Sequence, residues 1–111
     1  MEFDEYQKLA AKTAFYNLPG IHYKLMYLSM GLAGEAGEAV DKVKHVVRNQ
    51  DGNITEEKRE LLKKEIGDVL WYASQLALAL GLSFDDIAQH NIAKLADRAA
   101  RGVIQGEGDL R

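Results

Sequence analysis

Apolar residues recur along this chain at the spacing of amphipathic helices. The pattern is interrupted at Pro19-Gly20, and again by a run of polar turn-forming residues at 49–53. Thr55 and Ser83 each precede a new helical stretch and are typical N-cap residues, with acidic residues following in the first turn. We therefore expect helices over residues 2–17, 21–48, 55–81 and 83–101.

The expected fold class is all-α, because no segment alternates apolar and polar residues as a half-buried strand would. Four helices with short connections indicate a small four-helix bundle. A chain of 111 residues has room for one domain, so we expect residues 1–111 to form one, with an irregular tail over 103–111. The two longer helices carry more apolar surface than so small a bundle buries, and we expect a homo-oligomer, either a dimer or a tetramer.

Charge and composition exclude several classes of protein. With 14 basic and 17 acidic residues the formal net charge is -3, so nothing draws the chain as a whole to nucleic acid. The acidic start does not resemble a signal peptide, and the most apolar stretch, 69–82, is shorter than the ~20 residues of a membrane helix. We expect a cytoplasmic protein that binds neither nucleic acid nor membrane. Because cysteine is absent, carboxylates and histidine are the ordinary metal ligands available.

Two pairs of acidic residues differ from the others in their surroundings. Glu35 and Glu38 lie three positions apart in the second helical stretch, and Glu65 and Asp68 do so in the third, which places each pair on one helical face. Small or apolar residues flank both pairs, so we expect the four acids to line a partly buried interior. Carboxylates held together there repel one another unless pKa shifts or a hard cation relieve the cost, and Mg²⁺ or Mn²⁺ suits a set of oxygen ligands.

The segments around these pairs resemble a known family. They read GLAGEAGE at 31–38 and EIGDVLWY at 65–72, which gives the order Glu-x-x-Glu, 26 residues, then Glu-x-x-Asp. Both segments are similar to the metal-binding helices of the all-α nucleoside triphosphate pyrophosphohydrolases, the MazG-like group. A further segment, NIAKL at 91–95, also resembles that group, and the resemblance covers roughly residues 3–102.

The resemblance implies Mg²⁺-dependent hydrolysis of a nucleoside triphosphate between its α- and β-phosphates, giving a monophosphate and pyrophosphate, in nucleotide-pool housecleaning. On the matching positions Glu35, Glu38, Glu65 and Asp68 are expected as metal ligands. One of the four, with Glu38 as our first choice, is expected to take the proton of the attacking water as general base. A triphosphate brings about four negative charges, which carboxylates would repel unless divalent cations stood between them.

Five further residues are candidates for contact with the substrate. Asn91, Lys94 and Arg98 lie on one stripe of the fourth helical stretch. The family match favours substrate contact for the first two, and for Arg98 a phosphate contact and a solvated outer face are equal alternatives. Lys42 falls on the carboxylate face, where it neutralises the acids, touches phosphate or forms a surface ion pair. Tyr72 lies on the face of the third-helix acids, where it packs against ribose or base, or else in the core.

Two other functions also agree with the sequence. The related phosphoribosyl-ATP pyrophosphatase of histidine synthesis cleaves the same bond, and substrate profiling separates it from a general nucleotide hydrolase. A non-catalytic helical oligomerisation module would release no pyrophosphate from any nucleotide. The tail departs from many relatives, in which Tyr-Pro follows the arginine matching Arg98, and we assign it no role in closing the site.

Overall fold

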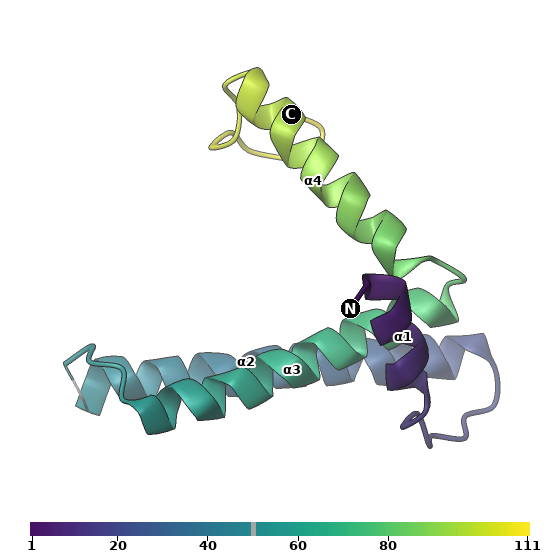
Figure 1. Ribbon diagram of the computed structural model, residues 1–111, viewed down its shortest axis with the longest axis horizontal. Helices are drawn as coiled ribbons and strands as arrows, with labels where there is room; N and C mark the ends of the chain where they lie inside the picture. Colours follow the sequence, from purple (N-terminus) through teal and green to yellow (C-terminus); the bar gives the residue numbers. More distant parts are fainter. Residues whose placement is uncertain (50) are drawn as a thin grey trace.

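The computed structural model describes residues 1–49 and 51–111, and these residues form four α-helices (Figure 1). The helices are α1 (Phe3–Ala11), α2 (Ile21–Asn49), α3 (Glu56–Ala79) and α4 (Phe84–Ala100). No strand occurs within the described ranges, so the expected all-α class is confirmed. The expected turn at 49–53 includes Gln50, which lies outside the described residues.

The first helix is shorter than expected, because it ends at Ala11 and not near residue 17. In a continuing helix the main-chain oxygen of Ala10 would accept the N–H of Ala14. Here it accepts the Thr13 main-chain N–H at 3.1 Å, the Thr13 hydroxyl at 2.9 Å and the Trp71 indole Nε1–H at 3.1 Å. A side chain from α3 therefore helps to end α1, and this contact between distant residues gives no signal in the local pattern.

α3 and α4 each begin directly after the residue predicted to cap them, Thr55 and Ser83. The Thr55 hydroxyl accepts the N–H of Lys58 at 3.2 Å, and the Ser83 hydroxyl accepts the N–H of Asp86 at 3.1 Å. Each bond satisfies one of the N–H groups that a helix leaves without a partner in its first turn.

The long helices α2 and α3 run side by side as an antiparallel pair, and the other two helices are attached near one end of it (Figure 1). α1 packs against α3, where the buried Gln7 donates from Nε2 to the main-chain oxygens of Ser74 at 3.2 Å and Leu82 at 3.0 Å. α4 contacts α1 and the end of α3, and it projects away from the pair so that none of its described residues touches α2. α4 consequently leaves the middle of the α2–α3 pair uncovered.

Asp4 connects the first helix to the last. Its carboxylate accepts the main-chain N–H of Asp85 at 2.9 Å and the hydroxyl of Ser83 at 2.9 Å, so a residue of α1 caps the start of α4. These bonds to the ionised form lower the pKa of Asp4. The direction in which α4 leaves the molecule is therefore fixed partly by α1.

The chain exposes more surface than a folded monomer of its mass. Its accessible area is 8096 Å², against roughly 6,100 Å² for a typical 12.4 kDa protein. The radius of gyration is 16.8 Å, against about 13 Å for a compact domain of this length. Met26, Met30 and Val40 on α2 are among the exposed large apolar side chains. None of the described helices combines the length and hydrophobicity that crossing a membrane requires.

Candidate metal and substrate site

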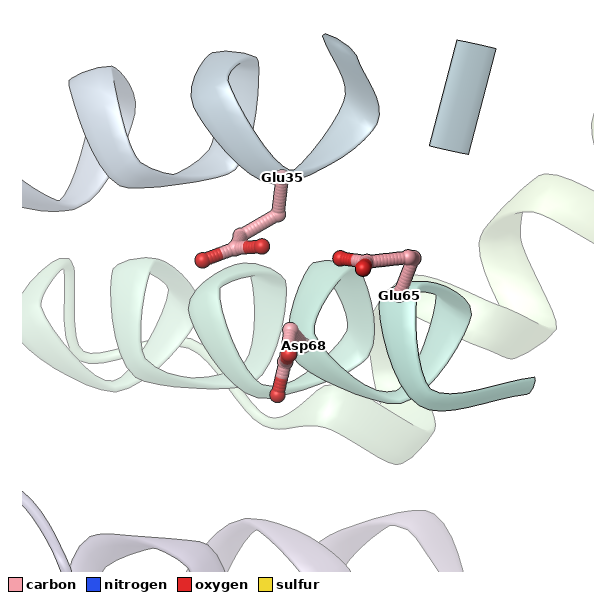
Figure 2. Close-up of side chains that lie close together, drawn as sticks. All are labelled: Glu35, Glu65 and Asp68. Carbon is pink, nitrogen blue, oxygen red and sulfur yellow. The ribbon is translucent and has the colours of Figure 1, made fainter. Parts of the chain in front are cut away.

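Three of the four expected ligands come together between α2 and α3. One carboxylate oxygen from each of Glu35, Glu65 and Asp68 lies within 4.8 Å of the other two, and Figure 2 shows Glu35 pointing from α2 toward the two acids of α3. We call these three residues the carboxylate cluster. Glu65 and Asp68 share a face of α3 because they are one turn apart, as the sequence predicts.

Gly31 allows the two helices to lie close together beside the cluster. It precedes Glu35 by one helical turn on α2. A Cβ atom at this position would overlap the ring of Tyr72, lying 2.5 Å from both Cδ1 and Cζ. Carbon atoms in ordinary contact are about 3.5–4.0 Å apart. The missing side chain thus lets an aromatic ring of α3 pack directly on the backbone of α2.

Tyr72 fills this contact and forms part of the packing between the helices. Its ring lies edge-on to Trp71 at a centroid distance of 5.0 Å and tilted against Tyr27 at 6.3 Å. Burial raises the pKa of the Tyr72 hydroxyl, and Tyr27 raises it further, followed by the charge of Glu35. The Tyr72 ring is half-buried and lies in the packing between the two helices, one turn from the cluster.

Lys42 supplies a positive charge to the cluster. Its Nζ lies 2.6 Å from Oε1 of Glu65 and 4.0 Å from Oε2 of Glu38. The hydrogen bond to Glu65 raises the pKa of Lys42. Lys42 therefore offsets part of the negative charge of the acids through ion pairs across and along the helix pair.

Glu38 lies at the edge of the cluster and not within it. Its side chain is 61% exposed, and its carboxylate is not among the three that converge. Glu38 is one turn beyond Glu35 on α2, and its charge contributes to the raised pKa of Glu35. The larger causes of that raised pKa are burial and then the charges of Asp68 and Glu65.

The donor set fits a hard divalent cation. All three groups offer carboxylate oxygens, which Mg²⁺ and Mn²⁺ prefer. Two oxygens bound to the same Mg²⁺ are at most about 4.2 Å apart, twice the usual bond length. Oxygens already within 4.8 Å reach that arrangement with small side-chain movements. A cation here would also relieve the mutual repulsion that helps to raise the pKa of Glu35.

The candidate substrate residues of α4 are not brought to the cluster. Asn91 is exposed, and Lys94 lies 3.7 Å from Oδ1 of Asp109 in the tail. Arg98 is only 5% exposed, and its Nη2 donates to the main-chain oxygen of Asp109 at 2.6 Å and to Oδ1 at 3.2 Å. The bond from Arg98 lowers the pKa of Asp109, as does the charge of Lys94. Arg98 therefore does not lie on a solvated face, and the helical pattern of the sequence gives no signal for its pairing with Asp109.

Comparison with known proteins identifies the family. A family model described as the MazG nucleotide pyrophosphohydrolase domain matches residues 25–103. The chain belongs to the MazG family. The matched range contains the whole carboxylate cluster, Glu38, Lys42 and the stripe of α4. The resemblance read from the sequence is thereby confirmed.

The MazG family comprises nucleotide pyrophosphohydrolases that generally depend on a divalent metal, and the carboxylate cluster is the candidate metal site in this member. A curated relative, the "Gene 37 protein" of Mycobacterium phage L5, is 47% identical over 116 residues, and the alignment covers 100% of both chains. That name carries no statement of activity. No solved structure matches this chain significantly.

Proposed function

We propose that this MazG protein is a Mg²⁺-dependent nucleoside triphosphate pyrophosphohydrolase that acts on the cytoplasmic nucleotide pool. It would cleave between the α- and β-phosphates and release a nucleoside monophosphate and pyrophosphate, removing non-standard or surplus nucleotides. The observation that carries the proposal is the convergence of Glu35, Glu65 and Asp68 from two helices of the matched domain. Mn²⁺ suits the same donors.

Each residue of the site has a defined task in this proposal. Glu35, Glu65 and Asp68 would hold the ion, which neutralises phosphate charge and polarises the attacking water when bound. Lys42 orients the Glu65 carboxylate and offsets its charge through the 2.6 Å contact. The Glu38 carboxylate is open to solvent, so it can accept the proton of a water molecule approaching along α2.

We also propose that the protein works as a homo-oligomer. The roughly 2,000 Å² of excess surface, obtained by comparing 8096 Å² with the typical value, exceeds the ~800 Å² per partner of a standard interface. A second copy on the apolar residues of α2 accounts for part of that excess. Because α4 projects away from its own α2, Asn91, Lys94 and Arg98 would contact phosphate at the cluster of another copy or after α4 changes direction.

The experiment that tests the activity is a substrate screen. Purified protein is incubated with ribo- and deoxynucleoside triphosphates and with phosphoribosyl-ATP, with Mg²⁺ and with chelator, and pyrophosphate and monophosphate are quantified. We expect Mg²⁺-dependent release of both products from nucleoside triphosphates. A strong preference for phosphoribosyl-ATP would instead assign the protein to histidine synthesis. If pyrophosphate is released from none of these substrates, the result would favour the non-catalytic helical oligomerisation module.

Variants locate the activity at the cluster. Asp68→Asn and Glu38→Gln should each abolish turnover while the far-UV circular dichroism stays helical. Glu60→Gln is the matched control, because Glu60 is an acid of α3 in a surface pair with Lys63 at 3.8 Å. Near-normal hydrolysis by both site variants would contradict the assignment.

A further inference from the structure

The C-terminal tail, residues 103–111, folds back onto α4. Gly102 and Gly108 adopt positive φ angles of 71° and 81°, which turn the chain where other residues would be strained. The main-chain N–H of Val103 donates to the oxygen of Arg98 at 2.9 Å and starts this reversal. The tail therefore runs beside the cationic stripe of α4.

The tail carries a carboxylate to the stripe. Oδ1 of Asp109 lies 3.2 Å from Nη2 of Arg98 and 3.7 Å from Nζ of Lys94, so one oxygen is shared by two cations. Asp109 itself is 86% exposed at its side chain, whereas Arg98 is buried. The carboxylate thus lies on the solvent side of both cations, where an anion arriving from water would meet them.

Polar contacts, with little apolar burial, hold the tail in place. Arg101 donates from Nη2 to the main-chain oxygen of Arg111 at 2.7 Å, and Arg111 donates from Nε to the oxygen of Val103 at 3.0 Å. Of the three large apolar side chains of the tail, Ile104 and Leu110 are exposed and Val103 is half-buried. A segment fixed by hydrogen bonds and ion pairs that are exposed or only partly buried, with little apolar contact, opens at low free-energy cost.

We propose that the tail is an internal competitor for phosphate, with the Asp109 carboxylate occupying the anion-binding pair Lys94 and Arg98 until a polyphosphate displaces it. The inference rests on the proposed function in taking this pair as a phosphate contact. A polyphosphate group offers more negative charge and more acceptor oxygens than one carboxylate, so it competes effectively for the same donors. Release of Asp109 also uncovers Arg98.

Competition of this kind lowers the apparent affinity for phosphate in proportion to the fraction of molecules in which the tail has released Lys94 and Arg98. A tail closed in about nine-tenths of the molecules weakens apparent binding about tenfold. Removing the carboxylate should raise the fraction of molecules with an open tail and so restore that affinity. Asp109→Asn does this, because it removes the ion pairs to Lys94 and Arg98 and leaves only the bond from Arg98 to the main-chain oxygen at 2.6 Å.

The experiment measures pyrophosphate binding by isothermal titration calorimetry in the presence of chelator. Without metal the carboxylate cluster repels pyrophosphate, so binding reports on cationic residues alone. We expect Asp109→Asn to bind pyrophosphate about three- to tenfold more tightly than the unchanged protein. Glu107→Gln is the matched control, because it removes the same charge from the tail, and among the described residues it is Asp109, not Glu107, that pairs with Lys94 and Arg98. Adding Lys94→Ala to Asp109→Asn should cancel the gain.

Equal affinities of Asp109→Asn and Glu107→Gln for pyrophosphate would overturn the proposal. Weaker pyrophosphate binding by Asp109→Asn together with a lowered melting temperature would also overturn it, because the tail would then be a structural support. In the nucleotide assay Asp109→Asn should lower KM about as much as it lowers the dissociation constant, with kcat unchanged. The calorimetric result does not need turnover. A protein that hydrolyses no nucleotide yet shows the gain in Asp109→Asn would refute the proposed function and leave the competition intact.

Discussion

Replacing Glu35 with Gln tests whether repulsion among the three carboxylates of the cluster destabilises the metal-free protein. Two unit charges 4.8 Å apart repel by about 0.9 kcal/mol at the dielectric constant of water and by about 3.5 kcal/mol at an effective value of 20. Asp68 is exposed, which favours the lower figure, and Lys42 offsets the charge of Glu65. We therefore expect Glu35→Gln to raise the free energy of unfolding of the metal-free protein by about 1 kcal/mol.

Mg²⁺ should reverse this order of stability. A ligand that binds only the folded state stabilises it by about 1.4 kcal/mol when its concentration is tenfold above its dissociation constant. The unchanged protein gains this term, whereas Glu35→Gln loses one charged ligand and gains much less. The variant should thus be the more stable protein in chelator and the less stable one in saturating Mg²⁺.

Urea denaturation followed by circular dichroism at neutral pH measures the free energy of unfolding, once with chelator and once with millimolar Mg²⁺. Glu60→Gln serves again as control, and it should change stability by less than about 0.5 kcal/mol without altering the response to Mg²⁺. The reasoning is refuted if Glu35→Gln is less stable than the unchanged protein in chelator, or if Mg²⁺ stabilises both equally.

Three further predictions concern the fold and assembly. Because the pKa of Asp4 is lowered, its contribution to stability is complete above the ordinary Asp pKa and is lost as pH falls through the lowered value. Asp4→Asn should therefore flatten the decline of the melting temperature between about pH 5 and pH 2. An unchanged decline would exclude the Asp4 cap as its cause. Gly31→Ala should cost about 1–3 kcal/mol in urea denaturation through overlap with Tyr72, and the cost should shrink in a Tyr72→Ala background; equal costs in both would point to another cause. Met30→Glu, at a side chain that is 70% exposed, should reduce the mass found by sedimentation velocity to that of a monomer, and an unchanged oligomer would place the interface elsewhere.

The helices and the acidic face could be predicted because both depend on local spacing. Thr55 and Ser83 cap their helices as their residue types predict, and Glu65 and Asp68 share a face because one turn separates them. The convergence with Glu35 followed from adjacency of the two helices, which short connections favour.

Contacts between distant residues could not be predicted in the same way. Local spacing favours Glu38 as the partner of Lys42, four residues apart, yet Lys42 lies closer to Glu65 across the helix pair, at 2.6 Å against 4.0 Å. Local spacing also does not predict the partner of Arg98, because Asp109 reaches Arg98 only after turns at two glycines reverse the chain. In both cases a charged side chain pairs according to the packing of whole elements.

The bond from Trp71 to the main-chain oxygen of Ala10 has a practical consequence. Trp71 is the single tryptophan of the chain, and its indole N–H is also 2.9 Å from the Thr13 hydroxyl. Detachment of α1 would expose this indole to water while α2 and α3 stay paired. The emission maximum of intrinsic fluorescence therefore reports the docking of one short helix, separately from the total helix content, without any attached label.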